Sequence, residues 1–233
     1  MKTYHYPPFL LFYLVISTFS ALGPDASNSL YNHLQLVYLW PSTFCLDRNM
    51  VCKKPVAQNF VLHGLWPADR AGNSLVYCSR TGSISRALTK YERQLAACWP
   101  SLSRHTTNRQ FWQYQWDKHG TCVLPRMNVL HYLQLMISRQ GKFNLLRALT
   151  SNNIKPNGSS YPRCIIEAAI RQEIGTRNLH MSCLNFRTRL FIKEVYMHLD
   201  VSGHKVVSCP ISNKTRGCGR SVNLVFSAAA SRV

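Results

Sequence analysis

The chain has 233 residues, of which 28 are Lys or Arg and 9 are Asp or Glu, so its formal net charge is +19. The length suits a single domain with one sizeable core, and the sequence has none of the repeats or heptads that mark solenoids and coiled coils. This charge favours polyanionic partners such as nucleic acid, acidic polysaccharide or an anionic membrane, although it also suits solubility or cell-wall adhesion.

The N-terminus is typical of a secretory signal peptide. Lys2 precedes an apolar stretch over residues 8–19, and the small residues Ser20, Ala21 and Gly23 follow. We expect residues 1–22 to be removed on secretion and residues 23–233 to form one domain. The alternative is a buried N-terminal strand or helix. The apolar run is too short for a membrane span and no later run is longer, so we expect no membrane association.

Two strands and their loops are predicted in the first part of the domain. Residues 32–38 alternate apolar and polar side chains and end at Trp40-Pro41. Residues 45–55 are typical of a loop, and residues 56–62 of a second strand that delivers His63 at its end. A polar, glycine-containing stretch over residues 68–85 predicts a surface loop.

The rest of the chain favours helices followed by strands. Apolar residues at helical spacing predict helices over residues 84–97, 107–118, 129–139 and 142–149. Strands are predicted over residues 190–199, 204–207 and 222–226. Without regular βαβ alternation, this order predicts an α+β domain with a central antiparallel sheet packed against several helices.

Two segments place a histidine among apolar residues and follow it with a glycine. His63 lies in the first segment, and His119 in the second, where Lys118 precedes it. For one such histidine, a packed core residue is the default interpretation. Two imidazoles and a cation are the minimum set for cleaving RNA: one takes the proton of the 2′-hydroxyl and the other protonates the leaving 5′-oxygen.

The two histidine segments resemble the active-site blocks of the secreted ribonuclease T-two family. Residues 63–67 read His-Gly-Leu-Trp-Pro and residues 116–122 read Trp-Asp-Lys-His-Gly-Thr-Cys. Further similarity in the first strand and at Cys209-Pro210 extends the resemblance over the mature chain. The high positive charge resembles the plant self-incompatibility ribonucleases (S-RNases), and residues 70–86 lie where S-RNases are hypervariable.

The resemblance implies the chemistry of the site. His119 would be the general base and His63 the general acid, while Lys118 and Gln115 would stabilise the pentacoordinate phosphorus. The product would be a 2′,3′-cyclic phosphate. No metal or cofactor is implied, and DNA is excluded because it lacks the 2′-hydroxyl. Lys118 should lower the pKa of its neighbour His119 through like charge.

Substrate contacts are also predicted. Trp40 and Phe111 would stack on bases, or belong to the core instead, and Ser101 and Leu102 would edge a base pocket. The remaining histidines have no motif and are predicted to be structural or on the surface: His33, His105, His131, His180, His198 and His204.

Two positions depart from the family pattern. Gln115 stands where the family usually has glutamate, and an amide can hydrogen-bond but cannot carry negative charge. Leu39 stands where many relatives have glutamine, so a polar contact to a base is lost. Gln115 therefore leaves open a ribonuclease-like protein that acts by binding.

Nine cysteines with a signal peptide favour disulfides, and without a CxxC pair a zinc cluster is not expected. The family pattern implies four disulfides that leave Cys98 over: Cys45–Cys52, Cys78–Cys122, Cys164–Cys218 and Cys183–Cys209. Asn157 and Asn213 lie in glycosylation sequons. We expect a monomeric style-side determinant of self-incompatibility, with a pollen F-box protein as the partner that the family implies. A basic relative for defence or RNA scavenging is the alternative.

Overall fold

A computed structural model describes residues 31–176, 179–209, 215–216, 218 and 223–228. The predicted signal peptide over residues 1–22 and the sequon at Asn213 lie outside the described residues. Within the described part of the chain, no helix is both long and apolar enough to cross a membrane.

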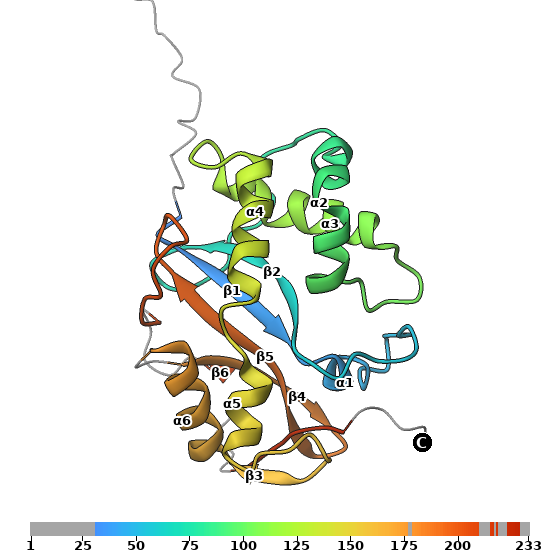
Figure 1. Ribbon diagram of the computed structural model, residues 1–233, viewed down its shortest axis with the longest axis vertical. Helices are drawn as coiled ribbons and strands as arrows, with labels where there is room; N and C mark the ends of the chain where they lie inside the picture. Colours follow the sequence, from blue (N-terminus) through green and yellow to red (C-terminus); the bar gives the residue numbers. More distant parts are fainter. Residues whose placement is uncertain (1–30, 177–178, 210–214, 217, 219–222, 229–233) are drawn as a thin grey trace, which may run out of the picture.

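A seven-stranded sheet forms the centre of the domain (Figure 1). Its strands are β1 (His33–Leu39), β2 (Val61–Ala68), β3 (Ser160–Pro162), β4 (His180–Phe186), β5 (Arg189–Leu199), β6 (Thr215–Arg216) and β7 (Asn223–Val225). The order β2-β1-β5-β4 is antiparallel throughout, while β6 pairs with β4 and β7 with β5 in parallel. The expected α+β class and antiparallel centre are confirmed.

The longer helices gather in two groups beside the sheet (Figure 1). They are α1 (Pro41–Phe44), α2 (Ser85–Cys98), α3 (Asn108–Lys118), α4 (Val129–Gln140), α5 (Leu145–Ser151) and α6 (Arg163–Ile174), with a 3-10 turn η1 (Gly120–Val123) after α3. The four helices expected from the sequence are present. Helix α3 begins at a capping box in which Thr107 and Gln110 satisfy each other's backbone amides.

Three expectations for secondary structure were wrong or incomplete. Helices α1 and α6 and strands β3, β4 and β6 were not predicted; no side-chain cap marks the start of α1 or α6. The strand expected over residues 204–207 is only a single bridge from Val206 to Leu199. Strand β2 starts later than expected and continues beyond His63, because Val61–Ala68 pairs along the whole of β1.

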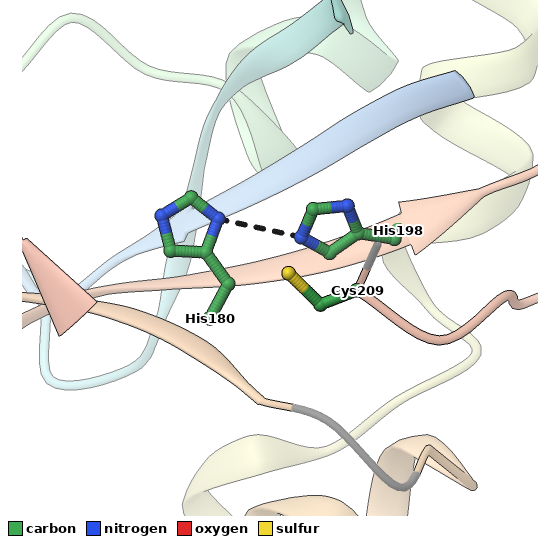
Figure 2. A group of neighbouring side chains, drawn as sticks. All are labelled: His180, His198 and Cys209. Carbon is green, nitrogen blue, oxygen red and sulfur yellow. Dashed lines mark hydrogen bonds between the residues drawn. The ribbon is translucent and has the colours of Figure 1, made fainter. Parts of the chain in front are cut away.

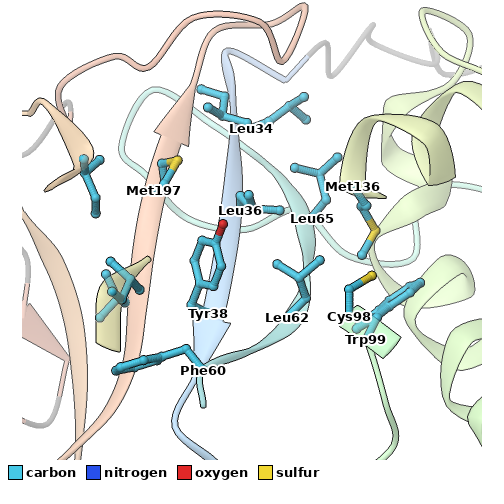
Figure 3. Close-up of a cluster of buried hydrophobic side chains, with 14 of the residues drawn as sticks. Leu34, Leu36, Tyr38, Phe60, Leu62, Leu65, Cys98, Trp99, Met136 and Met197 are labelled. Atoms are coloured by element: carbon cyan, nitrogen blue, oxygen red, sulfur yellow. The ribbon is translucent and has the colours of Figure 1, made fainter. Parts of the chain in front are cut away.

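Both faces of the sheet are buried at β1. Leu34, Leu36 and Tyr38 point into the main core, toward α4 (Figure 3). On the opposite face Val37 packs with Trp66 and Tyr196 in a second, smaller cluster. That second face carries most of the polar groups described below.

β-Bulges interrupt the sheet beside the candidate site. Val37 pairs with Gly64 and Tyr38 with Leu62, so His63 has no partner across the β1–β2 pair. A second register shift lies in the β4–β5 pair, immediately before Glu194. Bulges re-aim side chains, and these two turn His63 and Glu194 toward each other.

The early disulfides are as expected and the late ones are not. Cys45–Cys52 and Cys78–Cys122 are both formed. The late disulfide joins Cys183 to Cys218, so the expected pairs Cys164–Cys218 and Cys183–Cys209 are wrong. The parallel β4–β6 pairing sets Ser182 against Arg216 and thereby brings position 218 to Cys183, whereas Cys164 is exposed on α6. Cys98 is buried and outside any disulfide, as expected.

Replacing Gly120 with alanine should destabilise the fold. A Cβ atom there would collide with the indole ring of Trp116. We expect Gly120→Ala to lower the free energy of unfolding by about 1–3 kcal/mol, measured by urea denaturation. Gly141→Ala is the matched control, since its Cβ would meet nothing within 4 Å. Equal stability of the two variants would contradict the prediction.

Candidate active site

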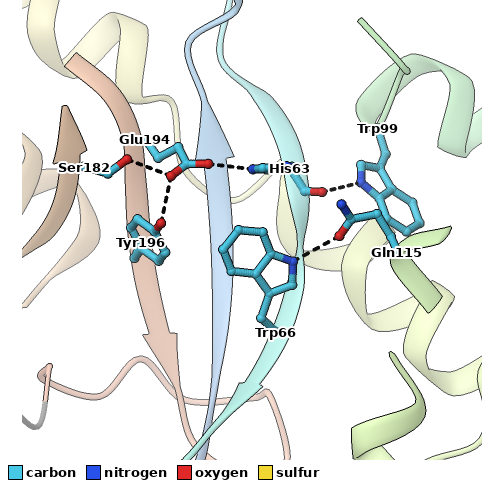
Figure 4. Close-up of polar contacts among 7 residues, drawn as sticks. All are labelled: His63, Trp66, Trp99, Gln115, Ser182, Glu194 and Tyr196. Atoms are coloured by element: carbon cyan, nitrogen blue, oxygen red, sulfur yellow. Dashed lines mark hydrogen bonds and ion pairs between the residues drawn. The ribbon is translucent and has the colours of Figure 1, made fainter. Parts of the chain in front are cut away.

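His63 lies in the bulge of β2, against a carboxylate from β5. Its Nδ1 atom is 2.6 Å from Oε1 of Glu194 (Figure 4). The hydroxyl groups of Ser182 and Tyr196 donate to the other carboxylate oxygen, at 2.6 Å and 2.7 Å. On the far side of His63, the indole N–H of Trp99 donates to its carbonyl oxygen at 2.8 Å. His63 is therefore fixed from both sides.

Glu194 is a buried carboxylate that stays ionised. Burial alone would raise the pKa of Glu194. The hydrogen bond and charge of His63 oppose this and, with the hydroxyl groups of Ser182 and Tyr196, bring that pKa down to about 2. Its negative charge faces Nδ1 of His63. Sequence reasoning missed Glu194, although an acidic residue inside a buried strand was a usable signal.

His119 ends helix α3 in a different environment. Its Nδ1 atom lies 3.0 Å from the carbonyl oxygen of Leu75, in the loop that the Cys78–Cys122 disulfide ties to η1. Burial is the largest cause that lowers the pKa of His119. The Leu75 hydrogen bond raises it, and the charges of Lys118 and His63 lower it further, to about 4. The expected effect of Lys118 therefore has the right sign, but burial outweighs it.

Trp66 lies between the two histidines. Its indole ring stacks on His119, with ring centroids 4.7 Å apart, and meets His63 edge-on at 4.9 Å. Its N–H donates to Oε1 of Gln115 at 3.1 Å (Figure 4). A Cβ atom at Gly64 would come within 2.5 Å of that indole nitrogen and 2.9 Å of the Gln115 oxygen. The glycine after each histidine thus makes room for a tryptophan ring.

A cleft of about 520 Å³ opens beside His63. The predicted residues Ser101, Leu102, Phe111 and Gln115 all line it, as does Leu39, which stands in place of the family's glutamine. The lining is mainly apolar, which suits the face of a base.

Loop contacts hold the wall of this cleft. Lys53 donates to the carbonyl oxygens of Ser101 and Thr106, at 3.0 Å and 3.1 Å. Cys52 and Ser103 form a bridge beside it. The segment 100–106 is therefore fixed to the loop closed by the Cys45–Cys52 disulfide.

Trp40 does not belong to the site. It is fully buried between Phe60 and Phe226, and its indole N–H donates to the carbonyl oxygen of Ser227 at 3.0 Å. The expectation that Trp40 stacks on a base was wrong, because this ring closes the end of the core.

Lys118 lies at the last turn of α3. Its Nζ atom is 5.6 Å from the centre of the Tyr114 ring, which also lines the cleft. The main-chain carbonyl of Lys118 accepts from the amide of Tyr77. Lys118 is therefore near a residue that lines the cleft and close enough to His119 to act on the pKa of that histidine.

Two imidazoles beside an apolar cleft are typical of an acid–base enzyme that binds a planar ring in the cleft. Comparison with known proteins agrees. The Ribonuclease T2 family matches residues 31–209. Ribonuclease S-5 of Pyrus pyrifolia is 31% identical over 205 residues, covering 87% of this chain and 86% of that protein.

Solved structures have the same fold. Ribonuclease MC1 from bitter gourd seeds superposes with a TM-score of 0.75 at 25% identity, covering 84% of this chain and 100% of that one. The SF11-RNase associated with gametophytic self-incompatibility in Nicotiana alata gives 0.73 at 27% identity, covering 84% and 99%. The chain belongs to the Ribonuclease T2 family. It is an endoribonuclease similar to the S-RNases.

Removing the charge of Glu194 should restrict activity to lower pH. Glu194→Gln leaves no negative charge to balance a protonated His63, so the alkaline limb of the kcat/KM profile should move to lower pH. We expect kcat/KM near neutral pH to fall by roughly 10- to 100-fold. Glu92→Gln, at an exposed carboxylate paired with Arg109, is the control. An unshifted alkaline limb would show that Glu194 has only a structural role.

Removing the charge of Lys118 should move the acidic limb of the kcat/KM profile to higher pH. Without this like charge the pKa of His119 rises from about 4, so His119 becomes protonated at higher pH. The acidic limb of the Lys118→Gln profile should therefore move to higher pH than in the wild type. Lys142→Gln, an exposed lysine after α4, should leave it in place. Coincident acidic limbs in all three proteins would exclude this coupling.

Proposed function

We propose that the protein cleaves single-stranded RNA by transphosphorylation and leaves a 2′,3′-cyclic phosphate. The observation that carries this proposal is the contrast between its two histidines. His63 faces a buried carboxylate, and His119 lies in an apolar environment near a cation. Environments that separate two titratable groups in this way assign one to the acid role and the other to the base role.

His119 suits the general base. If its Nδ1–H donates to the Leu75 carbonyl, Nε2 is left as the acceptor. A pKa of about 4 keeps His119 neutral through mildly acidic and neutral pH. Its Nε2 atom would take the proton of the 2′-hydroxyl as that oxygen attacks the phosphorus.

His63 suits the general acid. Glu194 accepts from Nδ1, so the proton on Nε2 is the one available to the leaving 5′-oxygen. Lys118 and the amide of Gln115 would stabilise the pentacoordinate phosphorus. Because the nucleophile is part of the substrate, the residues need no metal or cofactor for this step, and DNA is not a substrate.

The cleft would hold a base of the RNA. Phe111 is partly exposed there and offers a ring face for stacking, while Ser101 and Leu102 edge the pocket. The net charge of +19 would attract the phosphate backbone.

We further propose that the protein is secreted after removal of residues 1–22, is glycosylated at Asn157 and Asn213, and acts as a monomer. Asn157 is exposed in the turn between α5 and β3. The S-RNase names of its relatives support a role as the style-side determinant of self-incompatibility, with a pollen F-box protein as partner. Expression outside the style would favour the alternative, a basic ribonuclease for defence or RNA scavenging.

RNA cleavage by the purified protein tests the chemistry, with EDTA added only during the assay. The wild type should yield cyclic-phosphate ends, and His63→Ala and His119→Ala should each lose about 10²–10⁴-fold in rate. His131→Ala, at an exposed histidine on α4, is the control. If either site variant keeps full activity, or EDTA abolishes cleavage at once, the two-histidine mechanism is wrong.

A further inference from the structure

Three buried metal-ligating side chains meet outside the active site. His180 comes from β4, His198 from β5 and Cys209 from the segment that follows β5. They are 1%, 3% and 2% exposed. Figure 2 shows the two rings and the sulfur atom pointing toward one another. One ligand atom from each lies within 4.8 Å of the other two.

The spacing of the two histidine nitrogens suits a tetrahedral metal ion. Nδ1 of His180 and Nε2 of His198 are hydrogen-bonded to each other and lie 3.3 Å apart, and a metal ion would replace that hydrogen bond. Two imidazole nitrogens at ordinary Zn–N distances on a tetrahedral zinc ion are about 3.3–3.4 Å apart. The rings could therefore accept the ion with little movement of the two strands.

The donor set selects the metal. Two imidazoles and a thiolate are the ligands of zinc, whereas calcium and magnesium need oxygen ligands, and this cluster contains no carboxylate. We propose that His180, His198 and Cys209 bind a structural zinc ion. This inference concerns a second site and does not depend on the proposed RNA chemistry.

A fourth ligand is close by. The ring of His33, at the start of β1, is buried and its centroid lies 4.9 Å from that of His198. Structural zinc sites have four protein ligands, and a rotation of His33 would complete the set. The ion would then join β1, β4, β5 and the segment after β5.

The cluster lies beside residues that support the active site. The ring of His180 stacks on Tyr196, with centroids 3.8 Å apart. The Tyr196 hydroxyl donates to Glu194, which holds His63. A metal ion on His180 would therefore fix the strand pair that supports the general acid.

This site changes the expectation drawn from the sequence. The absence of a CxxC pair argued against a zinc cluster, and His180 and His198 were expected to be structural or on the surface. The proposed ligands come from two strands and a later segment, so their spacing along the chain forms no motif. The β4–β5 register, with His180 opposite Tyr196, brings the two histidines together.

Metal analysis of the purified full-length protein, with its disulfides intact, tests the proposal. After loading with zinc and dialysis, we expect about one zinc ion per chain by elemental mass spectrometry. Cobalt in its place should give the visible bands of a tetrahedral ion and a thiolate-to-cobalt charge-transfer band. Bound zinc should also raise Tm. None of these measurements uses RNA cleavage, so failure here and failure of the RNA mechanism are distinguishable.

Matched variants identify the ligands. Cys209→Ser and His198→Gln should lose the zinc and the Tm increase, while Cys164→Ser and His131→Gln, at exposed positions, should keep both. If the two cluster variants do not fold, the cobalt spectrum of Cys164→Ser shows whether a cysteine other than Cys164 binds the metal. Burial raises the pKa of the Cys98 thiol to about 11, so a thiolate-to-cobalt band in this variant would point to Cys209.

Two results would overturn the proposal. One is a folded wild type with no retained zinc and no thiolate-to-cobalt band, which would make the cluster a histidine pair packed on a buried cysteine. The other is retention of zinc by folded Cys209→Ser at the wild-type level.

Discussion

The indole of Trp66 is the contact on which the arrangement of the site depends. One face and one edge of this ring meet the two histidines, and its N–H reaches α3 through Gln115. It also packs edge-on against Tyr196 of β5, at 5.8 Å between centroids. Because an indole N–H only donates, it needs an acceptor, and an amide oxygen serves as well as a carboxylate. Gln115 can therefore keep the geometry that a glutamate would give while removing its charge.

That missing charge matters for the balance between the histidines. A carboxylate at position 115 would favour the protonated form of the neighbouring His119, and the amide does not. The single buried carboxylate described at this site, Glu194, lies instead with His63. A buried charge is tolerated only when it is well paired, and Glu194 has an ion pair and two hydroxyl donors. Negative charge is thus concentrated on the proposed acid and withheld from the proposed base.

The local sequence was enough to identify site residues that lie in continuous motifs. It was not enough to identify residues that come together only through the pairing of strands. His63 and His119 stood out because each lies in a distinctive segment. Glu194 reaches His63 only through two bulges, and Cys218 reaches Cys183 only through the β4–β6 pairing. Neither contact can be recognised from the spacing of residues along the chain. Trp40 was misassigned because an aromatic residue at a strand end looks the same in sequence whether it closes the core or faces a ligand.

The loop that covers His119 shows how such a site can tolerate sequence change. Two of its contacts run through main-chain carbonyls, since Gly72 accepts from Gln35 and Leu75 accepts from His119. The hydroxyl of Ser74 also donates to Gln35. The Cys78–Cys122 disulfide fixes its end. Main-chain contacts do not depend on side-chain identity, and the side chains of Val76 and Tyr77 are exposed. A loop in the position where S-RNases are hypervariable can therefore vary at its exposed side chains and still keep its main-chain contact to His119.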